Sequence, residues 1–223
     1  MSAPASLSAI ILAGGQSHRM GQDKALLTLP NGQLLLQRTA QVAQQLTSDI
    51  LVVTPWPERY RPILSSTVRL VKEQTASEAP AAANPLGPLD GFAQGWSQVR
   101  SDWCLLLACD LPNLAPTALQ QWWDWLMALS LAERPSAHLC SEARLTDAAN
   151  PQIMASLTPG TKGWEPLCGY YHRRCLPGLH RHIAGPDRSF QSWLTTIPIV
   201  AYRALPPSML FNCNTPKDWL EVK

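Results

Sequence analysis

Three continuous apolar runs, separated by segments of other patterns, constrain the fold of this chain most. The runs cover Leu7–Ala13, Ser48–Pro55 and Asp102–Pro112. Strands that are apolar on both faces are typical of parallel sheets covered by helices on either side. Between the runs, Leu34–Leu46 carries apolar residues at helical intervals, and Thr67–Glu73 reads as a shorter strand. We therefore predict an α/β fold of three layers, with a mostly parallel sheet and helices on both faces.

The alternation of predicted strands and helices is clear up to a helix that follows Pro116, and it is weaker beyond this helix. This helix carries Trp122, Trp123 and Trp125, which we expect to pack in the core and not to stack on a nucleobase. After Arg134, short fragments such as residues 137–140 and 151–156 alternate with proline-rich loops. A late strand is expected within Thr195–Leu205, and a short final helix follows a Thr-Pro pair.

Composition excludes several classes of protein. Hydrophobic residues make up 46% and charged residues 15%, which is typical of a globular protein. A formal charge of +2 is too small for a protein built mainly to bind nucleic acid. No apolar run approaches the ~20 residues of a membrane span, and the N-terminus lacks the basic start of a signal peptide, so we expect a cytoplasmic protein. The six cysteines form no Cys-x-x-Cys pair, which favours buried thiols over a zinc or redox site.

The stretch ILAGGQSHRMGQDKALL, at Ile11–Leu27, combines bare backbone with positive charge just after the first strand. Gly14 and Gly15 allow a ligand to approach the backbone closely, while Arg19 and Lys24 add two cations. In an open parallel sheet, ligands bind beyond this edge. The dinucleotide pattern Gly-x-Gly-x-x-Gly and the Walker pattern are both absent. We expect a triphosphate here; a tight turn with solvated charges is the alternative.

Two acidic residues follow other strands of the predicted sheet. Asp110 ends the third apolar run, on the same edge as Gly14 if the strands are parallel. One such carboxylate suits Mg²⁺, which takes one or two protein carboxylates together with phosphate oxygens and water; a turn-capping aspartate is the alternative. Glu73 ends the shorter strand, where a surface ion pair is an equally good interpretation. Gly87-Pro88 predicts a turn before the next helix.

Several motifs along the sequence resemble those of a known family. The pattern Leu-Ala-Gly-Gly-x-Ser-x-Arg-Met-Gly-x-Asp-Lys at residues 12–24 resembles the signature loop of the molybdenum cofactor guanylyltransferases. Gly-Pro-Leu-x-Gly at 87–91, Cys-Asp-x-Pro at 109–112 and Asn-x-Asn-Thr-Pro at 212–216 extend the resemblance along the chain. It implies a Rossmann-like nucleotidyltransferase fold. It also implies transfer of GMP from GTP to the terminal phosphate of molybdopterin, with molybdoenzymes or their chaperones as further partners.

The resemblance also implies roles for individual residues. Residues expected to bind the nucleotide are Leu12, Ala13, Gly14, Gly15, Lys24, Glu73 and Asp110. Arg19, Lys24 and Asp110 would act in catalysis, with Asp110 as the Mg²⁺ ligand. The chain departs from the family pattern in two places: Glu73 stands where an aspartate is usual, and Asn150-Pro151 where a His-Pro pair is usual.

A basic cluster in the second half suits an anionic acceptor such as the phosphate-bearing pterin. We expect Arg173 and Arg174, together with Asn212 and Asn214, at the acceptor. A solvated basic helix face is the alternative interpretation of the arginines. We treat residues 1–223 as a single domain, whose N-terminal half binds the nucleotide and whose C-terminal half binds the acceptor.

Two other functions remain open from the sequence. A nucleotidyltransferase with another base or acceptor, such as CTP with the same pterin or a sugar phosphate, would use the same loop and the same acid. A non-catalytic GTP-binding partner of a molybdoenzyme would need less than Lys24 and Asp110 together provide.

Overall fold

The computed structural model describes residues 5–15, 21–74, 87–131 and 153–222. Their strands form one seven-stranded sheet in the order β3-β2-β1-β4-β6-β5-β7. Within it, β6 runs antiparallel to β4 and β5, and the other described pairings are parallel. The mostly parallel sheet predicted from the sequence is therefore confirmed. The strands are β1 (Leu7–Leu12), β2 (Ile50–Thr54), β3 (Arg69–Lys72), β4 (Trp103–Ala108), β5 (Ala155–Gly160), β6 (Gly163–His172) and β7 (Ile199–Ala201).

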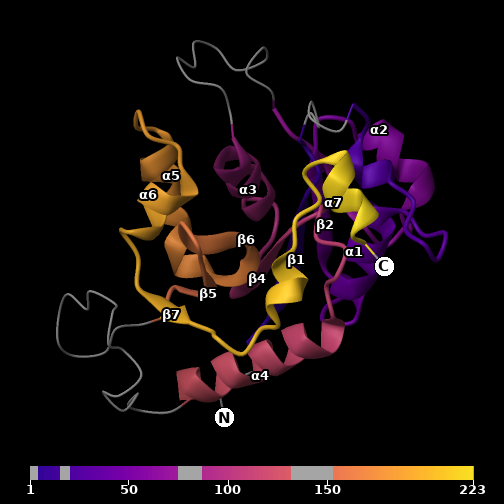
Figure 1. Ribbon diagram of the computed structural model, residues 1–223. Helices are drawn as coiled ribbons and strands as arrows, with labels where there is room; N and C mark the ends of the chain where they lie inside the picture. The colour runs from indigo at the N-terminus through magenta and orange to yellow at the C-terminus, as the bar shows by residue number, and fades with distance from the viewer. Residues whose placement is uncertain (1–4, 16–20, 75–86, 132–152, 223) are drawn as a thin grey trace.

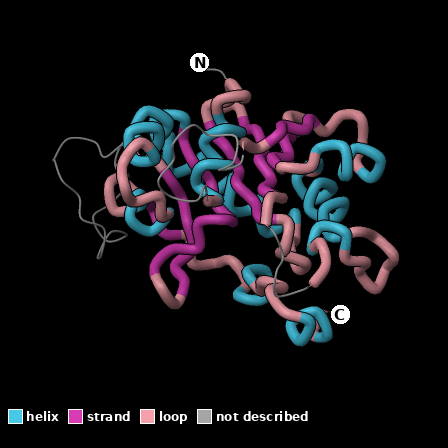
Figure 2. Tube along the Cα trace, turned by 90° about the horizontal axis from the view of Figure 1, so that it is seen from above, coloured by secondary structure: helices cyan, strands magenta, loops and turns pink. Residues whose placement is uncertain are grey.

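Helices cover both faces of the sheet (Figures 1 and 2), which explains why its central strands are apolar throughout. Ile11 of β1 belongs to a core that includes α1 and α4, while its neighbour Ile10 belongs to a core that includes α3, α5 and α6. None of the helices in the described part of the chain is long and apolar enough to cross a membrane. The helices are α1 (Leu35–Gln44), α2 (Pro57–Tyr60), α3 (Pro88–Trp96), α4 (Pro116–Leu131), α5 (Leu176–Ile183), α6 (Phe190–Leu194) and α7 (Pro216–Leu220).

The late strand is shorter than the sequence predicted. Only Ile199–Ala201 pairs with β5, because Thr195 and Thr196 end α6 with N–H bonds to Ser192 and Trp193. The final helix forms as predicted: the Thr215 side chain accepts the N–H of a residue in its first turn, and the next residue is proline. The fragment at 137–140 and most of the loop after Gln74 lie outside the described residues.

The tryptophans of α4 pack in the core, as predicted. Trp122 is fully buried and stacks on Tyr202, with ring centroids 4.9 Å apart and an interplanar angle of 7°. Its Nε1 donates a hydrogen bond to Ser156 Oγ at 2.8 Å. Trp123 and Trp125 are partly buried against the same core. These rings stabilise the layer between α4 and the sheet and leave no face for a nucleobase.

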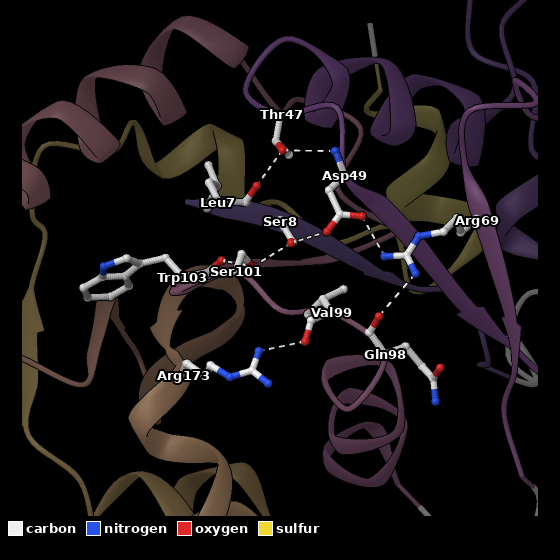
Figure 3. A network of polar contacts seen from close by, with 10 residues as sticks. All are labelled: Leu7, Ser8, Thr47, Asp49, Arg69, Gln98, Val99, Ser101, Trp103 and Arg173. Carbon is white, nitrogen blue, oxygen red and sulfur yellow. Dashed lines mark hydrogen bonds and ion pairs between the residues drawn. The ribbon is translucent and has the colours of Figure 1, made fainter. Parts of the chain in front are cut away.

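A polar network occupies the edge of the sheet where the parallel strands begin (Figure 3). The fully buried Ser8 donates to Asp49 Oδ2 at 2.5 Å and shares a hydrogen bond with Ser101 at 2.6 Å. Arg69 Nη2 donates to the other oxygen of Asp49 at 2.6 Å. Polar groups at this edge are thus satisfied within the protein.

The described cysteines are free, and four of them, Cys104, Cys168, Cys175 and Cys213, are buried. Burial raises the pKa of Cys168 and of Cys175 to about 12, so both are neutral thiols at physiological pH. This agrees with the predicted role of these cysteines as small buried hydrophobic residues.

Replacing Trp122 by Phe should lower the free energy of unfolding by about 1–3 kcal/mol, because the buried Ser156 hydroxyl loses its partner and part of the indole volume is left empty. Urea unfolding followed by circular dichroism measures the change. Trp125→Phe, at a partly buried position of the same helix, is the matched control and should cost clearly less. Equal losses in the two variants would contradict the packing described here.

Candidate functional site

A cavity of about 540 Å³ opens at the carboxyl ends of the parallel strands. This volume is within the roughly 300–1,000 Å³ typical of small-molecule sites. The segments after β1, β3 and β4 reach it, together with the start of α3. All seven residues predicted to bind the nucleotide line it: Leu12, Ala13, Gly14, Gly15, Lys24, Glu73 and Asp110.

Lys24 and Asp110 are in contact within this cavity. Lys24 Nζ lies 3.2 Å from Asp110 Oδ2 and donates to Asn214 Oδ1 at 2.7 Å. The two side chains of the ion pair are 16% and 19% exposed, so solvent screens them only partly. The Cys213 N–H donates to the Asp110 carbonyl at 3.1 Å. This bond ties the C-terminal segment that carries Asn214 to the end of β4.

Asp23 anchors the segment that carries Lys24, a role that was not predicted from the sequence. Asp23 Oδ2 accepts hydrogen bonds from the Tyr60 hydroxyl and from Arg59 Nη1, both at 2.8 Å. Burial and the neighbouring carboxylate raise the pKa of Tyr60, which therefore stays a neutral donor. Asp23 lines the cavity, but its carboxylate is already bound by Arg59 and Tyr60 of α2.

The Glu73 carboxylate is wedged between two glycines. A Cβ atom on Gly14 would collide with Glu73 Oε2, and a Cβ atom on Gly91 would lie 2.7 Å from Oε1. Burial, helped by the nearby Asp90 carboxylate, raises the pKa of Glu73. The absence of a Cβ atom at both glycines thus leaves room for the close approach of this side chain. Within the described part of the chain, Glu73 faces the cavity and makes no surface ion pair, contrary to the alternative interpretation of the sequence.

Comparison with known proteins identifies the family. A family model described as "MobA-like NTP transferase domain" matches residues 9–198. The chain belongs to the MobA-like NTP transferases. The family predicted from the sequence motifs is thereby confirmed.

Individual relatives of this MobA-like chain cover nearly its whole length. A "probable molybdenum cofactor guanylyltransferase" of Trichormus variabilis is 43% identical over 95% of this chain and 88% of its own length. One of Synechococcus elongatus is 38% identical over 95% of each chain. The crystal structure of molybdopterin-guanine dinucleotide biosynthesis protein A from Archaeoglobus fulgidus matches with a TM-score of 0.68 at 19% identity, covering 96% of each chain, and supports the fold.

The structure does not bring Arg173 and Arg174 of this MobA-like chain to the cavity. Because β6 is antiparallel to β4, its last residue, His172, pairs with Trp103, the first residue of β4. Both arginines therefore follow β6 at the edge of the sheet away from the cavity. There Arg173 Nη1 donates to the Val99 carbonyl at 2.8 Å (Figure 3). Sequence reasoning did not foresee this strand reversal, and we do not retain the two arginines in the acceptor site.

The other predicted residues fall into two groups. Asn214 reaches the cavity through Lys24, and Asn212 lines a smaller hollow of about 100 Å³ that shares Leu167 with the cavity. Arg19 lies outside the described residues, so its predicted role stays a prediction.

His172, at the edge of the sheet away from the cavity, should make the stability of the protein depend on pH. The His172 ring packs edge-on against Trp103 at 4.9 Å, and its Nδ1 accepts the Arg174 N–H at 3.1 Å. Burial, with the charge of Arg174, lowers the pKa of His172 from 6.5 to about 4. A histidine with a lowered folded-state pKa binds its proton more readily when unfolded. The folded protein should therefore lose stability as the pH falls from 6.5 towards 4.

His172→Gln should remove this part of the pH dependence, on the order of 1–2 kcal/mol after allowance for partial exposure. Thermal unfolding of wild type and variant at pH 7 and pH 4.5 measures it. His180→Gln, at an exposed position of α5, is the control and should follow the wild-type profile. Parallel profiles for wild type and His172→Gln would show that the ring is not held neutral.

Proposed function

We propose that this protein transfers GMP from GTP to the terminal phosphate of molybdopterin and releases pyrophosphate. The observation that carries the proposal is the single cavity in which all seven predicted nucleotide residues meet, with Lys24 against Asp110. The relatives are named as probable molybdenum cofactor guanylyltransferases, and we take from these names the guanylyl group that is transferred and the cofactor that accepts it. We further propose that residues 1–223 act as one domain in the cytoplasm and pass the product to molybdoenzymes or their chaperones.

In this proposal the glycine loop and Lys24 bind the phosphates. Gly14 and Gly15 leave β1 at the cavity with bare backbone, and the Lys24 ammonium is held there by Asp110 and Asn214. The attacking group is a phosphate oxygen that is already ionised at neutral pH, so no strong general base is needed. Catalysis then rests on positioning and charge neutralisation. Arg19 is our candidate for binding the leaving pyrophosphate.

Glu73 is our candidate for recognition of the base. Its carboxylate offers two acceptors at a fixed place between Gly14 and Gly91. The N1–H and 2-amino groups of guanine are two adjacent donors that match such a carboxylate. Adenine and cytosine do not present this pair of donors, so the contact would favour GTP.

The donor set of the cavity fits Mg²⁺. Asp110 presents its carboxylate there, and the described residues contain no group of three His, Cys, Asp or Glu side chains that could form a closed metal site. An ion held by one carboxylate, phosphate oxygens and water is the usual arrangement for Mg²⁺. When bound, it would stabilise negative charge on the phosphates during transfer. Lys24 keeps the Asp110 carboxylate directed into the cavity.

The hollow beside the cavity is our candidate site for the acceptor. It is lined by Glu165 and Asn212 among others, and Leu111 places it next to the proposed metal ligand. It shares Leu167 with the nucleotide cavity, so a phosphate that enters from this side would face the nucleotide. We keep Asn212 as an acceptor residue on this basis, and Asn214 because its Oδ1 accepts a hydrogen bond from Lys24 Nζ.

Pyrophosphate release from GTP, ATP and CTP in turn, with Mg²⁺ and with or without molybdopterin, tests the function. We expect release from GTP that depends on molybdopterin. Release from CTP instead would keep the chemistry and change the base. No release with any nucleotide, by protein shown to bind GTP, would favour the non-catalytic partner over the enzyme.

Asp110→Asn should lower turnover about 100-fold or more while the protein stays folded, because the metal and Lys24 both lose their carboxylate. Binding of Mn²⁺ in the presence of GTP, followed by electron paramagnetic resonance, should weaken in parallel. Asp124→Asn, on the exposed face of α4, is the matched control and should leave both unchanged. Intact turnover in Asp110→Asn would remove the metal assignment.

A further inference from the structure

Arg188, in the segment between α5 and α6, reaches the rim of the nucleotide cavity. Its Nη1 lies 3.0 Å from Asp90 Oδ1. Asp90 is in the first turn of α3, and its Oδ2 accepts the Gly87 N–H at 3.0 Å. Gly87 and Pro88 line the cavity. One carboxylate therefore joins an arginine of the C-terminal half to the wall of the nucleotide site.

The pair is buried to an extent unusual for a surface ion pair. The side chain of Asp90 is 6% exposed and that of Arg188 is 22% exposed, whereas Arg69 and Asp49, at the opposite edge, are 47% and 40% exposed. A buried carboxylate without a cation is strongly unfavourable. Arg188 therefore supplies the positive charge that compensates the buried Asp90 carboxylate.

Asp90 also influences Glu73. Gly91, the next residue of α3, packs against the Glu73 carboxylate, and the charge of Asp90 opposes ionisation of Glu73. The charged groups that share the cavity with Glu73 are Asp23 and Lys24 from the glycine loop and Asp110 from the end of β4. Asp90 lies behind the cavity wall, and Arg188 offsets its negative charge.

We propose that Arg188 is a positioning residue for the nucleotide: through Asp90 it holds the Gly87-Pro88 rim and keeps Glu73 available as an acceptor. The proposal rests on the proposed function, because it concerns the same nucleotide site. Arg188 acts through Asp90 and needs no contact with the substrate. Asp90 occupies the variable position of the Gly-Pro-Leu-x-Gly motif, and Arg188 lies 98 residues away, so the motif does not indicate the pair.

Arg188→Ala tests this inference. The Kd for GTP with Mg²⁺, measured by calorimetry, and the KM should each rise about tenfold, while kcat at saturating GTP stays within about threefold of wild type. Without the arginine, the uncompensated charge of Asp90 should keep Glu73 protonated to a higher pH. GTP binding by Arg188→Ala should therefore recover as the pH is raised from 6 to 9, more than binding by wild type does.

Three variants separate positioning from stability. Arg188→Lys keeps the charge and should restore most of the affinity. Adding Asp90→Asn to Arg188→Ala should bring the Kd back to within about threefold of wild type, because a carboxamide can accept the Gly87 N–H without a cation. Arg69→Ala removes the ion pair at the opposite edge and should leave GTP binding unchanged.

Folded Arg188→Ala that binds GTP within about twofold of wild type at every pH would overturn the inference. So would a loss of affinity that the added Asp90→Asn does not recover, since that would indicate general damage. If Arg188→Ala does not fold, Arg188→Lys and the double variant decide by the same comparison. Failure of wild type to bind GTP would instead refute the proposed function.

Discussion

The parallel pairing of β1 with β2 and β4 is the constraint on which the site depends. In this register Leu12 is level with both Val53 and Ala108. The glycine loop and the turn that carries Asp110 therefore leave the sheet side by side, and the Cys109 N–H still bonds to the Leu12 carbonyl at 3.2 Å. Backbone hydrogen bonds between these strands thus set the distance between Gly14 and the turn that carries Asp110.

The balance of charge in the cavity follows from these positions. Among the residues that the structure describes, Asp23, Glu73 and Asp110 place three carboxylates around one ammonium, that of Lys24. The Asp23 carboxylate is paired with Arg59 and that of Asp110 with Lys24, so much of the negative charge is offset within the protein. What remains disfavours a bare polyanion and suits a nucleotide whose charge is reduced by a divalent ion.

The sequence allowed prediction of whatever depends on local pattern. The buried runs of β1, β2 and β4 lie close to where the patterns put them, because a strand buried on both faces can be recognised from its own residues. The position of Arg173 was not predictable, because the direction of β6 is set by its pairing with β4. The contacts Asp23–Tyr60 and Arg188–Asp90 join ordinary residue types over long separations, and no local signal marks them.

The fit of Glu73 between Gly14 and Gly91 has an evolutionary consequence. Glutamate extends its carboxylate one methylene farther than aspartate, and that extra reach occupies the space that a Cβ atom on either glycine would need. An alanine at Gly14 or Gly91 would require the Glu73 carboxylate to move from its present position. The three positions are therefore coupled, and a change at either glycine is expected to move the carboxylate that we propose as the base contact.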